Sequence, residues 1–235
     1  MVNSKKCMII GASPVKNDSV FKEFNPKEYF VICADGGYAT AKEYGIEPDY
    51  TVGDFDSLGA KPDLPAQKYR VLPIEKDVTD TMFAAMLGIK KGCRDFVLIG
   101  CLKGDREDHS FANYNVLVYL AKKGAFPVIA DDTTKVFVLI NSRIKITDQK
   151  DSIVSVFPFG TNTCLVSYKG LKYPLNYGQL TVGDELMGVS NKVVSDDAEV
   201  YVHAGSALIM LYTKNEQAPQ IKRTQKRTTT RKSSF

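Results

Sequence analysis

The chain of 235 residues has no tryptophan, no long apolar run and no C-x-x-C motif. A membrane-spanning helix needs about 18 consecutive apolar residues, and no segment approaches that length. The apolar run at Cys7–Ile10 is also too short for the core of a signal peptide. The five cysteines are odd in number and widely scattered, which argues against a disulfide framework or a zinc site. We therefore expect buried free thiols in a cytoplasmic protein.

Two familiar nucleotide-binding motifs are also absent. The chain has no G-x-x-x-x-G-K-[ST] sequence, which excludes a P-loop enzyme. It has no G-x-G-x-x-G sequence either, so nothing indicates a dinucleotide-binding fold of that type. A nucleotide site in this protein has to be built from other residues.

No acidic residue follows Lys222 in the sequence. Six of the 31 lysines and arginines lie between Lys222 and Lys232, and without them 25 basic residues face 27 acidic ones. The net charge of +4 therefore belongs to the end of the chain. We expect residues 215–235 to form a basic tail without stable structure, because such a sequence cannot bury much apolar surface. A solvated terminus is favoured over a nucleic-acid contact.

The hydrophobic pattern divides the chain into two segments. In residues 1–133, the predicted strands alternate with helices at 38–44, 79–91 and 110–123. The strands of this segment are expected at 5–10, 29–34, 50–53, 69–72, 95–100 and 126–130. This alternation predicts an α/β domain with a largely parallel sheet.

The pattern changes in residues 134–214. Short β-like runs at 136–140, 153–157, 163–167, 199–203 and 207–212 are separated by glycine, proline, asparagine and aspartate. No long helical period lies between them. This segment is predicted to be an all-β domain, a sandwich.

Two acidic signatures follow strands of the α/β segment. Asp35 lies in the sequence A-D-G-G, and Asp54 and Asp56 lie in G-D-F-D-S. Open α/β sheets bind ligands at the carboxyl ends of their strands. In an extended segment Asp54 and Asp56 project to the same side, where two hard oxygen ligands suit Mg²⁺. The interpretation is a site that handles a nucleotide through a metal.

Three further motifs are D-V-T-D at 77–80, G-D-R-E-D-H at 104–109 and G-V-S-N at 188–191. Taken singly, each candidate residue has a structural alternative: helix capping for Asp77, Thr79 and Asp108, a tight turn for Gly36, Gly37, Ser190 and Asn191, and a local hydrogen bond for His109. Together the motifs supply carboxylates for a metal, glycines for close approach of a phosphate, and Arg106 for charge neutralisation.

The five motifs in this order, from Ala34 to Asn191, resemble those of the thiamine pyrophosphokinase family. The resemblance implies an α/β nucleotide-binding domain, a β-sandwich domain, and a homodimer whose active sites lie between subunits. The implied reaction moves a diphosphoryl group from ATP to the hydroxyl of thiamine, giving thiamine diphosphate and AMP. One departure is the absence of the tryptophan that some members place after the S-N pair, where this chain has Lys192–Val194.

The resemblance also implies a role for each candidate residue. Asp54, Asp56 and Asp80 correspond to Mg²⁺ ligands, and with Arg106 they form the expected catalytic set. Asp35 and Arg106 are expected to meet ATP, and Asp108, Ser190 and Asn191 to meet thiamine. The remaining expected substrate-binding residues are Gly36, Gly37, Asp77, Thr79 and His109.

Two alternative functions stay open at this point. One is a Mg²⁺-dependent diphosphotransferase that acts on another alcohol, such as a pterin. The other is a non-catalytic nucleotide- or RNA-binding protein, although clustered carboxylates and a β segment without an aromatic and basic stripe argue against it. No general base is assigned, and Asp108 is a candidate by position only.

Overall fold

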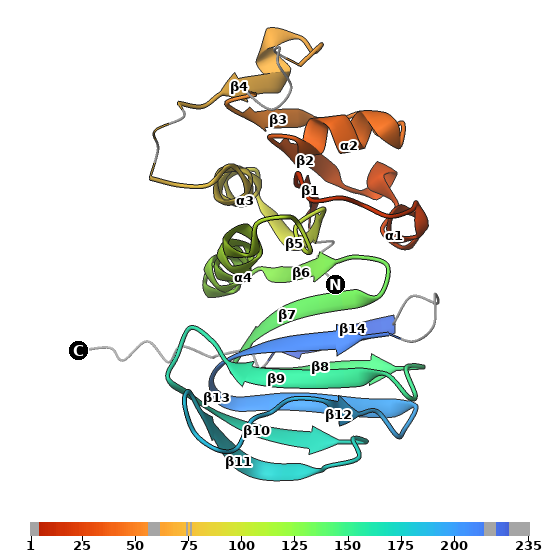
Figure 1. Ribbon diagram of the computed structural model, residues 1–235, viewed down its shortest axis with the longest axis vertical. Helices are drawn as coiled ribbons and strands as arrows, with labels where there is room; N and C mark the ends of the chain where they lie inside the picture. The colour runs from red at the N-terminus through yellow and green to blue at the C-terminus, as the bar shows by residue number, and fades with distance from the viewer. Residues whose placement is uncertain (1–4, 56–61, 74, 76, 214–219, 226–235) are drawn as a thin grey trace, which may run out of the picture. The chain divides into compact units, whose positions relative to one another are not determined.

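A computed structural model describes residues 5–55, 62–73, 75, 77–213 and 220–225 (Figure 1). The chain forms two compact units, one of Met1–Val138 with Met210–Ala218, the other of Leu139–Ile209 with Pro219–Phe235. The first is an α/β unit and the second a β unit. Each is described by itself below.

The α/β unit alternates strands and helices along the chain. Its strands are β1 (Lys5–Ile10), β2 (Phe30–Ala34), β3 (Tyr50–Gly53), β4 (Tyr69–Val71), β5 (Cys93–Ile99), β6 (Phe126–Ala130) and β7 (Thr134–Ile140). Its helices are α1 (Ser19–Glu23), α2 (Gly37–Glu43), α3 (Asp80–Lys90) and α4 (Glu107–Lys122), with short 3₁₀ turns at Pro26–Glu28 and Ala66–Lys68. The last residues of β7 belong to the β unit.

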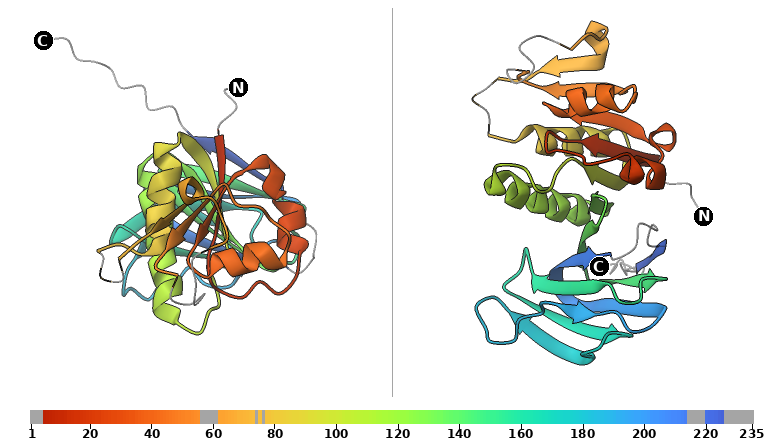
Figure 2. Two further views of the ribbon diagram at one scale, coloured as in Figure 1. Left: turned by 90° about the horizontal axis from the view of Figure 1, so that it is seen from above. Right: turned by 45° about the vertical axis from the view of Figure 1, so that its right-hand side comes forward.

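The sheet of this unit has the strand order β7-β6-β5-β1-β2-β3-β4. All neighbouring pairs from β6 to β4 are parallel, and β7 runs antiparallel to β6. Helices α3 and α4 cover one face and α1 and α2 the other (Figure 2). The chain moves outward from β1 to β4 and then returns to the opposite side of β1 as β5. The sheet therefore reverses its strand order between β1 and β5, where doubly wound folds bind ligands.

The central strands form the core of the unit. The side chains of Cys7–Ile10 in β1 are completely buried, and those of Phe96–Ile99 in β5 are nearly so. Such continuous apolar runs are typical of parallel strands that are covered on both faces. All five cysteines of the chain are buried and free, as the sequence predicted.

Most predicted elements of this unit have the expected bounds to within a few residues, and β1, β3 and β6 have them throughout. Gly45 ends α2 as expected, with φ of 64° and its N–H donated to the carbonyl of Lys42. Helix α4 begins at Glu107, three residues earlier than predicted. The alternative that Asp108 caps this helix is therefore wrong, because Asp108 lies inside its first turn.

The β unit is a β-sandwich of antiparallel strands. It contains β8 (Ser142–Thr147), β9 (Ile153–Pro158), β10 (Thr163–Lys169), β11 (Leu175–Thr181), β12 (Asn191–Lys192), β13 (Asp197–Tyr212) and β14 (Gln220–Gln225), the end of β13 belonging to the α/β unit. Strand β10 pairs with β11 and β13, β8 with β13 and β14, and β9 with β12 and β13.

Three expectations for this segment are corrected by the structure. The runs at 199–203 and 207–212 are one strand, β13, because Gly205 adopts φ of 84° and lets the strand bend without ending. Strands β8, β11 and β12 were not predicted from the sequence. Finally, the tail from residue 215 is not wholly without structure, because Gln220–Gln225 form β14 against β8. Backbone hydrogen bonds to an exposed strand edge suffice for such pairing.

No helix in the described ranges is both long and apolar enough to cross a membrane.

Position 37 has to be glycine because the first turn of α2 packs closely against the end of β1. A Cβ atom at this position would collide with the carbonyl oxygen of Ile10. We expect Gly37→Ala to lower the free energy of unfolding by about 2–3 kcal/mol, the usual cost of overpacking a core. Gly124→Ala is the matched control, since its Cβ meets open space and only the positive φ of 73° is strained, which costs about 1 kcal/mol. Urea denaturation of both variants measures the difference, and equal losses would contradict this interpretation.

Candidate functional site

A cavity of about 490 Å³ lies at the carboxyl ends of the strands of the α/β unit. It is bordered by the segments that follow β1, β2, β3 and β5 and by the first turns of α3 and α4. Its lining includes seven of the predicted site residues: Asp35, Asp54, Asp77, Thr79, Asp80, Arg106 and His109. Four separate segments, those after β2 and β3 and those at the starts of α3 and α4, thus bring these side chains to one place.

At this cavity the backbone that follows β1 packs directly against the backbone that follows β5, with no side chain between them. The N–H of Gly11 donates to the carbonyl of Ile99 (2.8 Å), and the N–H of Ser13 to the carbonyl of Gly100 (2.9 Å). A Cβ on Gly11 would lie 2.5 Å from the Gly100 oxygen, and one on Gly100 2.6 Å from the Gly11 oxygen. Only glycine fits at either position. This contact is located between β1 and β5, where the strand order reverses.

The two acidic signatures contact each other. The N–H of Asp35 donates to the carbonyl of Val52 (2.7 Å), and a Cβ on Gly53 would lie 2.9 Å from the Asp35 Cα. The glycine of G-D-F-D-S therefore leaves room for the backbone of Asp35. Asp35 and Phe55 have φ of 48° and 62°, a left-handed conformation that is uncommon for residues other than glycine. The backbone turns sharply after both strands and leaves Asp35 and Asp54 half-buried at the cavity.

The first turns of α3 and α4 also border the cavity. Thr79 caps α3, its hydroxyl accepting the N–H of Met82 at 3.2 Å, so the capping alternative is confirmed for this residue. Helix N-termini carry a partial positive charge and unpaired N–H groups, which favour bound anions. A phosphate group can therefore be held here by backbone as well as by side chains.

Arg106 is paired with Asp108 in a bidentate arrangement. Its Nε lies 3.1 Å from Oδ1 and its Nη2 2.5 Å from Oδ2. The hydrogen bond from Arg106 lowers the pKa of the Asp108 carboxyl, and the same bond raises the pKa of Arg106. Asp108 is therefore a weak proton acceptor, and it does not line the cavity. Its position suits orientation of Arg106 better than general-base catalysis.

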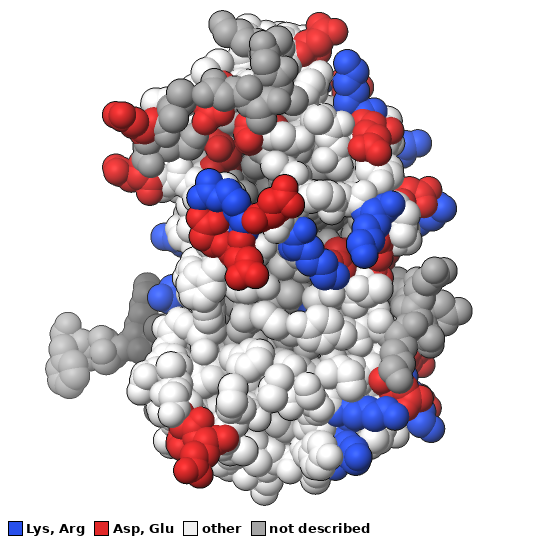
Figure 3. Space-filling view, in the orientation of Figure 1, with Lys and Arg blue, Asp and Glu red and all other residues white. Residues whose placement is uncertain are grey.

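The charge of the cavity is strongly negative. Asp35, Asp54, Asp77 and Asp80 face one arginine and one histidine among the lining residues. Charged side chains of both signs gather on the part of this face that the α/β unit forms, and acidic ones predominate on its left side (Figure 3). At such short range like charges repel strongly, so a polyphosphate requires a cation to bind here.

The donor set fits Mg²⁺ by its chemistry, because carboxylate oxygens are its preferred protein ligands. Among the described residues, no three histidine, cysteine, aspartate or glutamate side chains gather closely enough to hold a metal ion. Asp56, one of the three expected ligands, lies outside the described residues. Asp54 and Asp80 both line the cavity.

Three other expected residues lie away from the cavity lining. Gly36 and Gly37 form the turn into α2, where Gly37 is buried against β1. Asn191 belongs to the β unit, where its Oδ1 accepts the N–H of Tyr173 (2.9 Å) and its Nδ2 donates to the Tyr173 carbonyl (2.7 Å). Asn191 thus fixes β12 to the neighbouring loop.

Ser190 also belongs to the β unit and precedes β12. It is exposed, with φ of 59°, and its N–H donates to the hydroxyl of Ser155 at 3.1 Å. The thiamine contacts expected of Ser190 and Asn191 stay predictions.

The sequence analysis missed some of the lining. The segment Gly11–Ser13 directly follows β1, and Asn113 is held by a bond from its Nδ2 to the carbonyl of Cys101 (3.0 Å). Two signals could have found them. Gly11–Ser13 follows a strand as the acidic signatures do, and Asn113 lies four residues after His109 on the same face of α4.

Comparisons with known proteins agree with this architecture. The model of the thiamin pyrophosphokinase catalytic domain matches residues 21–129, and that of the thiamin pyrophosphokinase vitamin B1 binding domain matches residues 141–209. Thiamine pyrophosphokinase of Bacillus subtilis is 28% identical over 185 residues, which cover 77% of this chain and 85% of that protein.

Solved structures show the same fold. The crystal structure of the Bacillus subtilis thiamine pyrophosphokinase has a TM-score of 0.75 at 22% identity and covers 90% of this chain and 100% of its own. That of yeast thiamin pyrophosphokinase has a TM-score of 0.72 at 14% identity, with 91% and 87% covered. Together, the two domain models and the fold show that the chain belongs to the thiamine pyrophosphokinase family.

Proposed function

We propose that this protein transfers the diphosphoryl group of ATP to the hydroxyl of thiamine, giving thiamine diphosphate and AMP. Membership of the family supports thiamine diphosphorylation in general. The observation that carries the specific reaction is the cavity where the strand order reverses, which combines carboxylates, two helix N-termini and Arg106. Such a site can bind a metal-complexed polyphosphate. Its four lining carboxylates serve no purpose in a protein that binds free phosphate alone.

Asp54, Asp80 and the undescribed Asp56 would hold Mg²⁺, which when bound screens the triphosphate from the carboxylates and stabilises charge on the leaving phosphate. The other groups of the cavity bind and orient. Arg106 presents a guanidinium that can pair with phosphate oxygens, and Asp108 fixes its direction. The first N–H groups of α3 and α4 can donate hydrogen bonds to the same anion.

The transfer of the diphosphoryl group requires few other contributions from the protein. In phosphoryl transfer, positioning and charge stabilisation supply most of the rate enhancement. The hydroxyl of thiamine has to lie in line with the β-phosphorus and the departing AMP. The buried thiols of the chain favour a reducing compartment, and we propose the cytoplasm.

Activity is expected to require a divalent metal and the carboxylates that face the cavity. EDTA should abolish turnover, and Asp80→Asn should lower it by about 100-fold or more, the loss expected for a major electrostatic element. Asp148→Asn, which changes an exposed aspartate of the β unit outside residues 173–194, is the matched control and should retain wild-type activity. Circular dichroism verifies folding of both variants. A folded Asp80→Asn protein with near-wild-type turnover would exclude the metal assignment.

The spent nucleotide is expected to be AMP, because attack at the β-phosphorus moves two phosphoryl groups together. Chromatography after incubation with ATP, Mg²⁺ and thiamine should show AMP and thiamine diphosphate in equal amounts. A hydroxymethylpterin in place of thiamine should give no AMP above background. Formation of ADP with a monophosphate ester would overturn the reaction, and AMP formed only with the pterin would overturn the acceptor.

We also propose that the protein is a homodimer whose active sites are shared between subunits. Seven large apolar side chains between residues 173 and 194 are exposed by 47–67%: Tyr173, Tyr177, Val182, Leu186, Met187, Val189 and Val194. Exposed apolar surface of this extent is typical of an interaction site. In Figure 3 the visible face of the β unit is also mostly without charged side chains.

Subunit mixing tests the shared site. Chains carrying Asp80→Asn and chains carrying Ser190→Arg should each be nearly inactive. Co-expressed, they should recover about a quarter of wild-type activity per site, because random assembly makes about half of the dimers mixed, each with one intact site. Ser190 is chosen over Asn191, whose side chain holds β12. Sedimentation confirms the dimer, and verified mixed dimers without recovery would contradict the shared site.

A further inference from the structure

One face of the β unit carries a stack of aromatic rings that the proposed reaction does not use. The rings of Tyr177 and His203 lie face to face, with centroids 4.0 Å apart and planes inclined by 15°. The ring of Tyr201 lies 4.0 Å from that of His203, with an inclination of 42°. Tyr177, at one end of the stack, is 61% exposed, so a flat molecule from solvent can extend the stack.

The three rings lie on the outer face of one sheet of the sandwich. In β10 the side chains of Val166 and Tyr168 are buried in the sandwich, and that of Ser167 between them is half-buried on the opposite face. Ser167 is the register partner of Tyr201 in β13, which is in turn the partner of Arg143 in β8. Strand β11, which carries Tyr177, pairs with the other edge of β10.

A single hydroxyl group fixes the stack. The Oγ of Ser167 accepts the N–H of Tyr177 at 3.0 Å and lies 2.7 Å from the Nε2 of His203. Tyr177 itself has φ of 51°, which is uncommon for an aromatic residue. Unusual backbone of this kind is often found where binding needs a particular geometry. Rings that are already held in place lose little entropy on binding.

Three cations share the outer face with the rings: Arg143, Lys145 and Lys169. Arg143 is the register partner of Tyr201, and both lysines are register partners of Glu199. The side chains of the three cations are 39–74% exposed. They are therefore accessible to an anionic ligand that lies across the face.

Two acidic residues on the same face pair with these cations. The Oε2 of Glu199 lies 3.5 Å from the Nη1 of Arg143, and the carboxylate of Asp197 lies 3.6 Å from the Nζ of Lys145 and 3.4 Å from that of Lys169. Ion pairs between exposed side chains contribute little free energy. The phosphates of a ligand can therefore compete for the cations.

The basic end of the chain begins on the same sheet. Strand β14 pairs with the edge of β8, and Lys222 is the register partner of Lys145. Six lysines and arginines, and no acidic residue, lie between Lys222 and Lys232. The excess positive charge of the chain therefore starts in a strand next to the cations of β8.

We propose that this outer face binds single-stranded RNA, with a base stacked on Tyr177 and the phosphates paired with the three cations and the basic end of the chain. Surfaces that bind single strands combine aromatic rings for the bases with basic groups for the backbone. A hollow of about 450 Å³ on this face gives room for a nucleotide, and its lining includes Ser167, Lys169, Glu199 and Tyr201.

An unpaired strand fits this face better than a duplex, because a base has to leave its own stack before it can lie on a protein ring. The sequence does not reveal the face, since its rings and cations belong to β8, β10, β11 and β13 and meet only in the folded sheet. With this ligand the basic end of the chain has a binding role and is not only a solvated terminus. The inference goes beyond the proposed reaction and does not depend on it.

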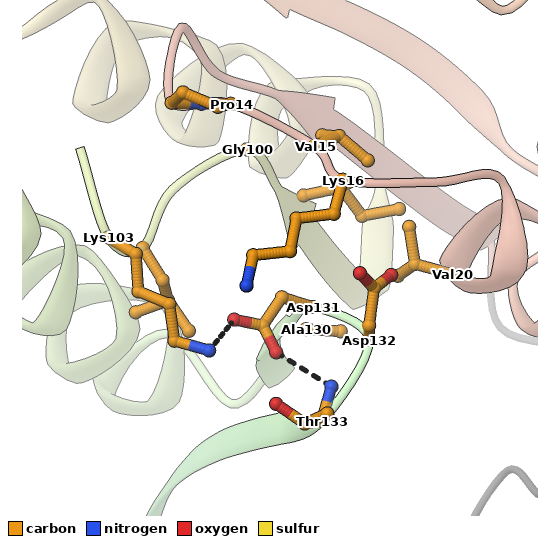
Figure 4. A pocket seen from close by; sticks show the side chains of 12 residues that line it. Pro14, Val15, Lys16, Val20, Gly100, Lys103, Ala130, Asp131, Asp132 and Thr133 are labelled. Carbon is orange, nitrogen blue, oxygen red and sulfur yellow. Dashed lines mark hydrogen bonds and ion pairs between the residues drawn. The ribbon is translucent and has the colours of Figure 1, made fainter. Parts of the chain in front are cut away.

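Another pair of lysines lies at a cavity of about 110 Å³ in the α/β unit, where Lys16 and Lys103 extend inward from opposite sides (Figure 4). Gly100 lines both this cavity and that of the candidate site. On its rim, the carbonyl of Thr133 accepts the N–H and the hydroxyl of Thr213, at 2.8 and 3.2 Å. The described residues that line it include no aromatic side chain. This cavity belongs to the candidate site and offers no ring for stacking.

Fluorescence anisotropy of the full-length protein tests the proposal. The probe is a labelled single-stranded RNA of mixed sequence, about 12 nucleotides long, which is within the usual range of site sizes. Tyr177→Asn removes the ring, and asparagine tolerates the left-handed backbone. Tyr177→Phe keeps the ring. Tyr212→Asn removes a tyrosine of the α/β unit that is 42% exposed, and it is the matched control.

We expect Tyr177→Asn to weaken RNA binding by about fivefold or more, the contribution of one stacked base. Tyr177→Phe and Tyr212→Asn should bind RNA like the wild type. Unchanged RNA affinity of folded Tyr177→Asn would overturn the proposal. An affinity that falls only together with a loss of dimers, measured by sedimentation, would also overturn it, because Tyr177 would then belong to the contact between subunits.

Lys169→Gln tests the role of charge, with Lys22→Gln as its control. Both lysine side chains are 74% exposed and paired with an aspartate. Only Lys169→Gln should weaken RNA binding, and it should lower the salt dependence, the slope of log K against log salt, by about 0.7 for one lost phosphate contact. Equal effects of the two substitutions would overturn the proposal. So would a wild-type protein that binds no RNA, or that binds duplex RNA or phosphatidylserine vesicles as tightly as the single strand.

Discussion

The close contact between the backbones of Gly11 and Gly100 is the constraint on which the site depends. Gly11 directly follows β1 and Gly100 directly follows β5, the buried central strands of the sheet. The carbonyl oxygen of each glycine occupies the space that a side chain on the other would need. The segments that carry Ser13, Lys16 and Lys103 are therefore fixed relative to each other by backbone hydrogen bonds. Because β1 and β5 are also the strands between which the order reverses, this backbone contact lies at the edge where doubly wound folds bind ligands.

Two neighbouring cavities at the carboxyl ends of the strands differ in the charge of their lining residues. Four carboxylates gather where a metal-bound phosphate chain is expected, and Arg106, the arginine of the lining, is paired with Asp108. The neighbouring cavity after β1 and β5 instead carries Lys16 and Lys103 over apolar side chains such as Val15.

The sequence predicted the fold wherever burial alone decides the structure. Strand β1 is a continuous apolar run, and a strand buried on both faces leaves little choice of register. Strands β11 and β14 were missed because their sequences are polar, and their pairing depends on a partner edge that the local pattern does not reveal. The single strand β13 was predicted as two, since a glycine in a strand can mark either a bend or a turn.

The same distinction applies to the site residues: the pattern of strands and helices predicts some of their positions, and others depend on contacts that the sequence does not reveal. Asp35, Asp54 and Asp80 come together because strand ends and helix starts of an α/β unit share one edge, which the sequence pattern predicts. The pairing of Arg106 with Asp108 depends instead on side-chain direction within one helical turn, which spacing does not determine. The substrate contact of Asn191 was predicted from its motif and stays a prediction. The hydrogen bonds between its amide and the backbone of Tyr173 depend on a neighbouring loop, which the motif does not reveal.

The hydrogen bonds from Thr213 to Thr133 have a consequence for synthesis of the protein. The α/β unit consists of the first 138 residues and the short segment Met210–Ala218, and the hydrogen bonds to the carbonyl of Thr133 come from Thr213 in that segment. During translation, the α/β unit therefore cannot form these bonds when its first 138 residues have emerged from the ribosome. It has to wait until β8 to β13 have been synthesised, and of the strands of the β unit only β14 is made after the segment that completes the α/β unit.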